Sequence, residues 1–449
     1  MKHIILILMV LLSITTGYSQ DNKNVEPIII LKNGTIIDMV SDIVKKGTVI
    51  INGQIIQKIT YDNDFETPSN AITYDLTGKF IIPGLIDNHV HITHGSLKQA
   101  QNNLKTALLN GVTGVRDMGG DGRMLALLKR NMLIDEYSGP DVFFSTIIAG
   151  IKFFENDPRP GQVALGAQAG NVSWQWAIDK NSDFNSMVLQ AKGLGATAIK
   201  IYTDVNKSLM NKVSQAAKKQ GLKVWAHASI APTRPLDVTN AGVDVMSHAG
   251  DFIQYELADV IKDRYAFSSK AEATEYRNQI NKIEFDIDNK KVKNLLSAMK
   301  SNNSYLDATL WVYYNKVDAS ALQRAQKATR LAYQYGVKIS AGSDHMINEE
   351  NSDINIHNEL ALLVQAGLTQ LDALRAATIN NAVGIGEQSN IGSIEEGKLA
   401  NLIILNSDPI ENISNTRTIQ YVLKRGKVYQ GINSSRFALQ HSDEKLIKK

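Results

Sequence analysis

The feature that most constrains the fold is a change of pattern at Phe80, from which short apolar strands alternate with helical stretches. This alternation predicts parallel β/α units, because two parallel strands need a long, usually helical, crossover between them. Eight strands are predicted, over residues 80–87, 112–116, 142–146, 198–202, 223–226, 243–247, 305–310 and 338–341. Glycines that can end a helix stand just before several of them, at Gly111, Gly221, Gly242 and Gly336. The fold class is therefore α/β, with a closed (β/α)₈ barrel.

Strand patterns also flank the barrel region. Strands are predicted over residues 27–31, 35–40, 48–51, 54–60, 401–405 and 418–429, and a helix over 371–384. Asn33-Gly34 and Asn52-Gly53 favour type I′ hairpin turns, because both central residues of that turn need a positive φ. Arg425-Gly426 is predicted to be another turn. We expect residues 20–82 and 385–435 to form one small composite β-sandwich, with the barrel, residues 83–384, inserted between them.

The two ends of the chain are predicted to lie outside the folded part. Residues 1–19 combine a basic start, an apolar run and a small polar end, the layout of a cleaved secretory signal peptide. The run is about half of the roughly 20 apolar residues that cross a bilayer, so no stable membrane span is expected. The chain has no cysteine, so a secreted or periplasmic location would add no disulfides. Residues 436–449 are expected to be a charged, solvated tail.

The charge balance excludes one class of partner. The 48 basic and 45 acidic residues are scattered along the chain and leave a net charge of +3. Nucleic-acid binding needs a basic patch or stripe, which is missing here. The residues specify no oligomeric state.

Two connections are longer than a strand-to-helix loop needs to be. Residues 147–180 carry several aromatic residues and glycines, and either cover a site or pack an insertion against the barrel. Residues 249–303 are charged and helical in pattern, and are expected to be a surface excursion.

Ionisable side chains stand within or just past the predicted barrel strands. They are His89, His91, Lys200, His227, His248 and Asp344. The carboxyl ends of barrel strands meet at one mouth, where sites of this fold lie. His89 and His91 are two residues apart on an extended segment, so both imidazoles can reach one cation. The pattern predicts a metal site at the mouth.

Lys200 lies inside an apolar strand, which is costly for an ammonium group. Burial lowers a lysine pKa toward the neutral amine, and a neutral amine can add carbon dioxide to give an anionic carbamate. A carbamate has two oxygens and could bridge two cations. The alternative is an ion pair between Lys200 and either Asp204 or Asp344.

Several stretches of the sequence resemble the amidohydrolase superfamily, in its imidazolonepropionase-like branch, which includes the prolidase-like Xaa-Pro dipeptidases. The matching stretches are residues 83–91 (PGLIDNHVH), 111–120 (GVTGVRDMGG), 199–202 (IKIY), 342–344 (GSD), 373–378 (ALRAAT) and 392–402 (GSIEEGKLANL). The similarity covers about residues 27–430 and implies a TIM-like barrel. Residues 147–180 depart from the pattern of the dipeptidases, which leaves the substrate open.

The resemblance implies a role for each matching residue. It places His89 and His91 on one metal ion, His227 and His248 on the other, and N6-carboxylated Lys200 between them, with Asp344 on the first. Two divalent cations, for which Zn²⁺ suits the ligands, would activate a water molecule and polarise a carbonyl. Asp344 would be the catalytic acid and base. Dipeptides or N-acyl amino acids are the implied substrates.

Other residues near these positions have two interpretations each. Tyr202 is expected on the same strand face as Lys200, as a substrate ligand or as an ordinary aromatic of the barrel rim. Arg116 would contact the substrate or support a metal ligand, or would form an ion pair with Asp117. The histidines His94, His345 and His357 are candidates for orienting the metal ligands.

Two other functions remain open at this point. The same site could hydrolyse a lactone, a cyclic amide or a phosphoester, because the fold does not determine the reaction. A non-catalytic binding protein is the other alternative, although it would have no need of all six ligand-type residues.

Overall fold

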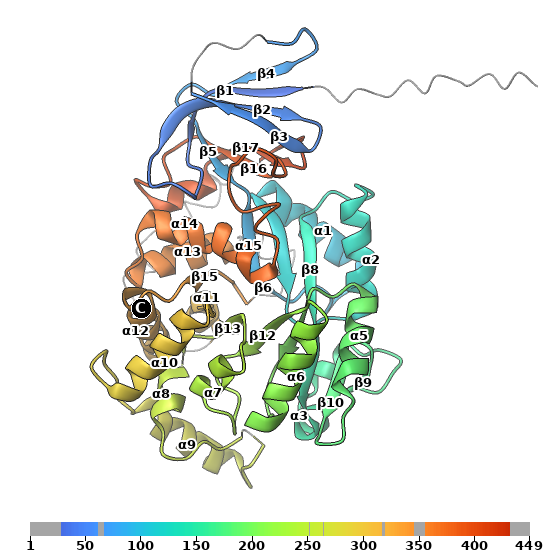
Figure 1. Ribbon diagram of the computed structural model, residues 1–449, viewed down its shortest axis with the longest axis vertical. Coiled ribbons are helices and arrows are strands. Elements are labelled where there is room, and N and C mark those ends of the chain that lie inside the picture. The colour runs from blue at the N-terminus through green and yellow to red at the C-terminus, as the bar shows by residue number, and fades with distance from the viewer. Residues whose placement is uncertain are drawn as a thin grey trace, which may run out of the picture.

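A computed structural model describes residues 28–61, 67–250, 252–263, 265–316, 319–344 and 355–431 of the 449-residue chain. The predicted signal peptide, the predicted tail and His345 lie outside the described residues. None of the described helices is both long and apolar enough to cross a membrane. A β-sheet stands at one end of the elongated molecule, above a barrel surrounded by helices (Figure 1).

The predicted eight-stranded barrel is confirmed. Its strands are β6 (Leu85–Val90), β7 (Val112–Asp117), β8 (Asp141–Gly150), β11 (Ala198–Ile201), β12 (Lys223–His227), β13 (Val245–Ser247), β14 (Tyr305–Asp307) and β15 (Ile339–Ser340). Consecutive members pair in parallel from β6 to β15. Two backbone bonds close the ring, from Asn88 N–H to the Ala341 carbonyl at 3.1 Å and from Asp344 N–H to the His89 carbonyl at 2.8 Å.

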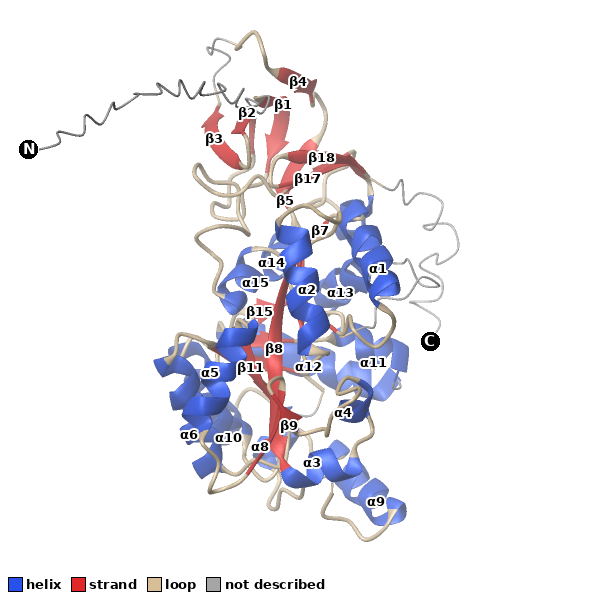
Figure 2. Ribbon diagram, turned by 90° about the vertical axis from the view of Figure 1, so that its right-hand side faces the viewer, coloured by secondary structure: helices blue, strands red, loops and turns tan. Residues whose placement is uncertain are grey.

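Helices surround the barrel and bury their apolar faces against it (Figure 2). They are α1 (Leu97–Leu109), α2 (Gly122–Leu133), α5 (Phe184–Leu194), α6 (Lys207–Lys219), α7 (Pro235–Asn240), α10 (Lys290–Ser301), α11 (Leu310–Lys316), α12 (Ala319–Tyr335) and α13 (Asn355–Gln365). The Ser96 and Asn206 side chains accept backbone N–H bonds at the starts of α1 and α6. Gly111, Gly221, Gly242 and Gly336 all have positive φ, as expected where a helix ends before a strand.

Strands from both ends of the chain form one eight-stranded sheet, which confirms their predicted association. They are β1 (Ile29–Ile36), β2 (Lys45–Asn52), β3 (Ile55–Thr60), β4 (Ile72–Asp75), β5 (Phe80–Pro83), β16 (Leu402–Leu405), β17 (Ile419–Lys424) and β18 (Lys427–Gln430). The N-terminal strands join the C-terminal strands where β5 pairs antiparallel with β16. This sheet has an apolar cluster of its own, separate from the core of the barrel.

The first predicted barrel strand is two strands in the structure. β5 belongs to the end sheet and β6 to the barrel, with Gly84 between them. The Gly84 N–H donates to the Asn401 carbonyl at 2.8 Å, and a Cβ at this position would collide with the Thr113 side chain. This close backbone approach lets the chain pass from one sheet to the other, and it places His89 inside β6 instead of after it.

The predicted turns met different outcomes. Asn33-Gly34 lies within β1, where the pairing with β2 shifts register, so it forms a bulge and the predicted hairpin is wrong. At the β2–β3 hairpin the central residues are Gly53 and Gln54, and of these two Gly53 alone has a positive φ, the pattern of a type II′ turn. Arg425 and Gly426 both have positive φ and join β17 to β18, as predicted.

The predicted helix 371–384 is divided into α14 (Gln370–Ala376) and α15 (Ile379–Ile385). The division falls at Thr378, whose backbone is not helical (φ −130°, ψ −97°). Beyond α15, a short 3₁₀ helix over Ile413–Arg417 precedes β17.

The long connections contribute structure to the barrel mouth. β8 continues to Gly150 and is followed by α3 (Ile151–Asn156), α4 (Arg159–Gln162), β9 (Asn171–Val172) and β10 (Gln175–Ile178). β10 pairs in parallel with the extension of β8. Residues 249–303 form α8 (Phe252–Leu257), α9 (Lys270–Asn281) and α10, and two of their side chains line the cavity described below. A purely superficial role for this segment is therefore wrong.

Candidate active site

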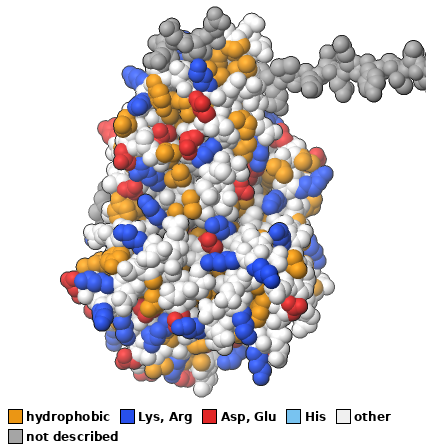
Figure 3. Space-filling model, viewed as in Figure 1, with side chains coloured by type: hydrophobic (Ala, Val, Ile, Leu, Met, Phe, Trp, Pro, Cys, Tyr) orange, Lys and Arg blue, Asp and Glu red, His pale blue; other side chains and the backbone are white. Residues whose placement is uncertain are grey.

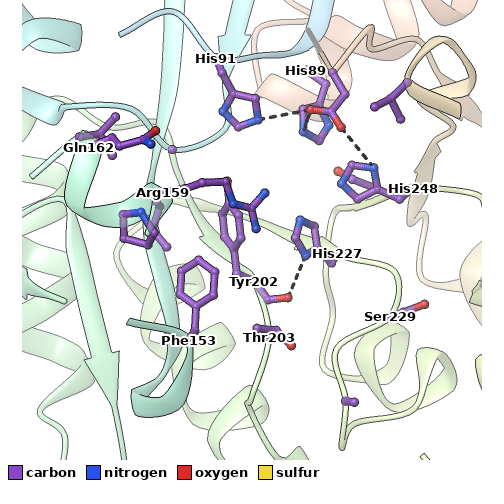
Figure 4. Close-up of a pocket in the computed structure, with 18 of the residues that line it drawn as sticks. His89, His91, Phe153, Arg159, Gln162, Tyr202, Thr203, His227, Ser229 and His248 are labelled. Atoms are coloured by element: carbon purple, nitrogen blue, oxygen red, sulfur yellow. Dashed lines mark hydrogen bonds and ion pairs between the residues drawn. The ribbon is translucent and has the colours of Figure 1, made fainter. Parts of the chain in front are cut away.

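A cavity of about 570 Å³ opens at the carboxyl ends of the barrel strands. Of the six residues predicted to bind metal, five line it, namely His89, His91, His227, His248 and Asp344 (Figure 4). Lys200 lies behind this lining and contacts Ser247, which is a lining residue. The barrel thus brings together side chains from the ends of five strands.

His89, His91 and Asp344 form the tightest group. Their ligand atoms all lie within 4.8 Å of one another. Oδ1 of Asp344 is 3.5 Å from Nε2 of His89 and 3.3 Å from Nε2 of His91. A carboxylate between two imidazole nitrogens is a typical donor set for a divalent transition metal.

Asp344 is held at this position by its backbone. It has a left-handed φ of 48°, and its N–H closes the barrel on His89. Burial alone would raise the pKa of the Asp344 carboxyl, but the neighbouring His89, His91 and His248 imidazoles hold it well below the usual value. Oδ2 is 3.8 Å from Nδ1 of His248, so the two oxygens face two different parts of the ligand set.

His227 and His248 form the second pair, with ring centroids 4.8 Å apart. Nδ1–H of His227 donates to the Tyr202 carbonyl at 2.9 Å, which leaves Nε2 as the unprotonated nitrogen of the neutral ring. Nδ1 of His248 bonds with the Thr309 hydroxyl at 2.9 Å, and burial lowers the pKa of this ring to about 3. The His248 ring is therefore neutral near pH 7, the form that binds metal.

Lys200 is fully buried in β11, and its Nζ donates to the Ser247 hydroxyl at 2.8 Å. Burial, reinforced by the nearby Arg116 charge, lowers the Lys200 pKa well below its usual value. The described residues show no ion pair between Lys200 and Asp204 or Asp344 within 4 Å. The alternative of a simple ion pair is thus not supported by the structure.

Asp307, at the end of β14, is a site residue that the sequence analysis missed. Its Oδ2 lies 2.8 Å from Nδ1 of His89 and 3.1 Å from Nη2 of Arg116. Arg116 is fully buried, donates to the Asn88 carbonyl and stacks its guanidinium on the Trp225 ring at 4.4 Å. Arg116 therefore supports His89 through Asp307, and is not itself one of the residues that line the cavity.

The predicted alternative of an Arg116–Asp117 ion pair is wrong. The Asp117 carboxylate accepts backbone N–H bonds from Ile92, Gly119 and Gly120 instead. It therefore fixes the loops that follow β6 and β7.

Tyr202 lines the cavity, but its hydroxyl is engaged elsewhere. It donates to the Met118 carbonyl at 2.6 Å, while the ring packs on His227 with centroids 4.6 Å apart. Burial raises the pKa of the phenol, so it stays protonated. The structure places this side chain as a wall of the site, and its hydroxyl proton is not directed at a ligand.

The other histidines differ in position. His94 lines the cavity, and its ring centroid is 5.9 Å from that of His91. His357 is buried in α13 and bonds with Thr416 and the Asn110 carbonyl, so its predicted role in orienting metal ligands is wrong. His345 lies outside the described residues.

The long connections complete the cavity with residues that were not singled out. From residues 147–180 come Arg159, Gln162 and Phe153, and from 249–303 come Tyr255 and Lys262. The aromatic content of 147–180 was the available signal for Phe153. Nothing in the local sequence distinguishes Arg159 from the many surface arginines and lysines, which are interspersed with acidic side chains on the face seen in Figure 3.

Comparison with known proteins agrees with this geometry. A model of the amidohydrolase family matches residues 80–429. The imidazolonepropionase of Alkaliphilus metalliredigens is 20% identical over 414 residues, which cover 86% of this chain and 90% of the relative. A solved structure of a Xaa-Pro dipeptidase with methionine in its active site superimposes with a TM-score of 0.69 at 24% identity, over 90% of this chain and 100% of that one.

Other similarities are local. The adenine deaminase of Desulfatibacillum aliphaticivorans is 34% identical over 87 residues, which are 19% of this chain and 14% of the deaminase. The chain thus spans a small part of that relative's length. The family match covers most of the chain, and the long alignments are with the branch that the sequence motifs resemble. The chain belongs to the amidohydrolase family.

Proposed function

We propose that this amidohydrolase is a metal-dependent enzyme that cleaves amide bonds of small molecules, with dipeptides and N-acyl amino acids as the candidate substrates. The observation that carries the proposal is the convergence of His89, His91 and Asp344 within 4.8 Å, in a cavity also lined by His227 and His248. The names of the long-coverage relatives, an imidazolonepropionase and a Xaa-Pro dipeptidase, support hydrolysis at carbon–nitrogen bonds.

The donor set fits divalent cations. The His89 and His227 rings each use Nδ1–H for a hydrogen bond to an oxygen acceptor within the protein, so Nε2 would be the metal-binding nitrogen. Nδ1 of His248 bonds with the Thr309 hydroxyl. Such bonds fix the tautomer and orientation of metal-binding histidines. Nitrogen and carboxylate donors of this kind suit zinc. His89, His91 and Asp344 would hold one ion, and His227 and His248 the other.

Lys200 would complete the set as a carbamate. Its neutral amine attacks carbon dioxide, forms an N–C bond and releases one proton to solvent, giving an anion with two oxygens. The Ser247 hydroxyl, 2.8 Å from Nζ, is positioned to donate to that anion. Full burial removes the competing solvated ammonium form.

When bound, the cations would supply Lewis acidity, which lowers the pKa of a water molecule and polarises the carbonyl of the amide. Asp344 would act as the general base and general acid. One carboxylate oxygen can accept the proton of the attacking water, and the same group can deliver it to the nitrogen of the departing amine. Because amines leave poorly unless protonated, this transfer is needed for cleavage of an amide.

Amine release from a panel of dipeptides and N-acyl amino acids, using enzyme reconstituted with zinc and bicarbonate, tests the proposal. Hydrolysis should require metal and be lost on chelation. If no amide is cleaved while lactones, cyclic amides or phosphoesters are, the reaction assigned here is wrong. Less than one equivalent of metal per chain, together with no turnover of any of these compounds, would indicate a binding protein.

The proposal includes export from the cytoplasm. It rests on the signal-like layout of residues 1–19 alone. Mass spectrometry of the protein recovered from the periplasm or medium should find a mature N-terminus near residue 20. Recovery in the cytoplasm with Met1 intact would contradict it.

A further inference from the structure

The cavity contains a cationic group that metal binding does not use. Arg159 belongs to α4, within the segment in which the sequence departs from the dipeptidase pattern, and its side chain lines the cavity. Figure 4 shows the guanidinium pointing into the cavity, on the side of Tyr202 and Phe153. Burial raises the pKa of Tyr202 and lowers that of His94, and the charge of Arg159 acts to lower both, so the guanidinium lies near these two lining residues.

Asp157 orients the Arg159 side chain. Nε of Arg159 donates to Oδ1 of Asp157 at 2.9 Å, and Nη2 donates to Oδ2 at 2.5 Å. The Asp157 side chain is 10% exposed, whereas that of Arg159 is 58% exposed. These two hydrogen bonds, called the fork below, occupy the Nε–Nη2 edge of the planar guanidinium and leave the edge that carries Nη1 for a ligand. The geometry of a guanidinium edge matches that of a carboxylate.

The remaining charges of the cavity also favour an anion. Among the described lining residues Asp344 is the sole carboxylate, and it lies between imidazoles. Lys262 supplies a second cation from the segment after β13, with a longer ion pair of 3.7 Å to exposed Glu272. The rings of Phe153 and Tyr202, 5.4 Å apart, provide an apolar wall beside Arg159.

We infer that Arg159 binds a free carboxylate of the substrate, so that the enzyme selects amides of amino acids with an unblocked carboxyl group and an apolar side chain. This inference rests on the proposed amide hydrolysis at the same site. Asp157 is a positioning residue for Arg159. The specificity is thus set by residues 147–180, and the reaction by the ends of the barrel strands.

The chain contains a matched control for Arg159. Arg123 forms the same fork with the aspartate two residues before it, with Nε to Asp121 Oδ1 at 3.0 Å and Nη2 to Oδ2 at 2.6 Å. Its side chain is 52% exposed, but it stacks on Trp174 and does not line the cavity. Substitution of each arginine by glutamine therefore removes the same local motif, and only one of the two variants changes the cavity.

The test compares N-acetyl-L-phenylalanine with its C-terminal amide, measured by acetate release from the zinc-loaded full chain. For the acid, Arg159→Gln should raise KM at least about tenfold, because the loss of one hydrogen bond to a charged group weakens binding by about that factor. The change in kcat should be smaller. Arg123→Gln should behave as wild type. Asp157→Asn should raise KM for the acid less than Arg159→Gln does, with kcat retained.

The outcomes separate the two proposals. If wild type cleaves acid and amide equally well, or if Arg159→Gln leaves KM for the acid unchanged, carboxylate recognition is wrong while amide hydrolysis stands. If neither compound is cleaved, hydrolysis of this class is wrong, and calorimetric titration with the same two compounds decides the role of Arg159. Tighter binding of the acid that is lost in Arg159→Gln supports the role, and equal binding of acid and amide overturns it.

Discussion

The Asp307 carboxylate accepts a hydrogen bond from Nδ1–H of His89 at 2.8 Å. Both side chains are buried inside the barrel. This bond fixes the tautomer of His89 and directs Nε2 toward Asp344, 3.5 Å away. Arg116 donates to the same oxygen and balances the charge of Asp307. His89, the proposed metal ligand, is therefore oriented by a buried pair that does not line the cavity.

The first prediction follows from that relationship. Asp307→Asn should weaken metal binding about 10- to 100-fold, because an amide is a weaker acceptor than a carboxylate and less able to hold the imidazole. Metal affinity is measured by competition with a chromogenic chelator. Because the change also leaves Arg116 without its buried counter-ion, circular dichroism at the assay temperature must first show a folded variant.

Thr309→Ala is the matched control for this prediction. It removes the hydroxyl that bonds with Nδ1 of His248, but no buried charge. Its metal affinity should fall less than that of Asp307→Asn. Unchanged affinity in a folded Asp307→Asn protein would show that this carboxylate does not orient His89.

The second prediction concerns Lys200. Lys200→Ala should lower both bound metal and the rate of amide cleavage, since no carbamate can then link the two sets of ligands. Labelled ¹³C-bicarbonate should give a carbamate resonance in wild type and none in the variant. Added short-chain carboxylates should restore part of the activity. A variant with wild-type metal content and rate would refute the carbamate.

The barrel could be predicted because its signals are local. Each strand is a short apolar run, and the glycines before the strands mark where helices end. The errors occur where non-local contacts decide the outcome. The break at Gly84 depends on Thr113 and Asn401, and the Asn33 bulge depends on pairing with β2.

The candidate site shows the same division. Four histidines, a lysine and an aspartate within or just past apolar strands stand out in the sequence, and five of these six residues line the cavity. Asp307 is the last residue of β14 and lies inside the predicted strand 305–310, so the same signal was present there and was overlooked. Arg159 lies in the four-residue helix α4 of a long connection, where no such signal exists. The bond of the Tyr202 hydroxyl to the Met118 carbonyl depends on how two loops meet, which no local pattern specifies.

The third prediction tests what joins the end sheet to the barrel. Asp141, at the start of β8, pairs with Lys424 at 3.0 Å, and their side chains are 8% and 6% exposed. Asp141→Ala leaves the lysine charge buried without its partner and should lower the free energy of unfolding by about 3–5 kcal/mol. Chemical denaturation measures the change.

An exposed pair between the same two parts of the molecule provides the control for Asp141. Lys427 and Asp135 are 2.5 Å apart, with side chains 54% and 51% exposed. Asp135→Ala should therefore cost less than about 1 kcal/mol. Equal losses of unfolding free energy in the two variants would mean that burial does not determine how much the Asp141 pair stabilises the protein.

The last prediction concerns His357, whose role proved to be in packing. Nε2–H donates to the Asn110 carbonyl at 3.1 Å, and burial, with a contribution from the Arg417 charge, lowers the His357 pKa to about 3. An unfolded histidine titrates near pH 6.5. Below that pH the unfolded chain gains a proton that the folded protein does not bind, so the contribution of His357 to stability is full above pH 6.5 and decreases toward pH 3. Between pH 7 and pH 5 this loss is about 2 kcal/mol.

His357→Gln isolates the contribution of His357 to the pH dependence of stability, because every other titrating group is common to both proteins. The amide can still donate to the Asn110 carbonyl, so the variant should fold, with lower stability than wild type at pH 7. The difference in unfolding free energy between the two proteins should shrink by about 2 kcal/mol on going from pH 7 to pH 5, since glutamine does not titrate. Denaturant titrations at the two pH values measure it, and metal content should be equal throughout. A difference that stays constant with pH would show that His357 is protonated as readily in the folded protein as in the unfolded chain.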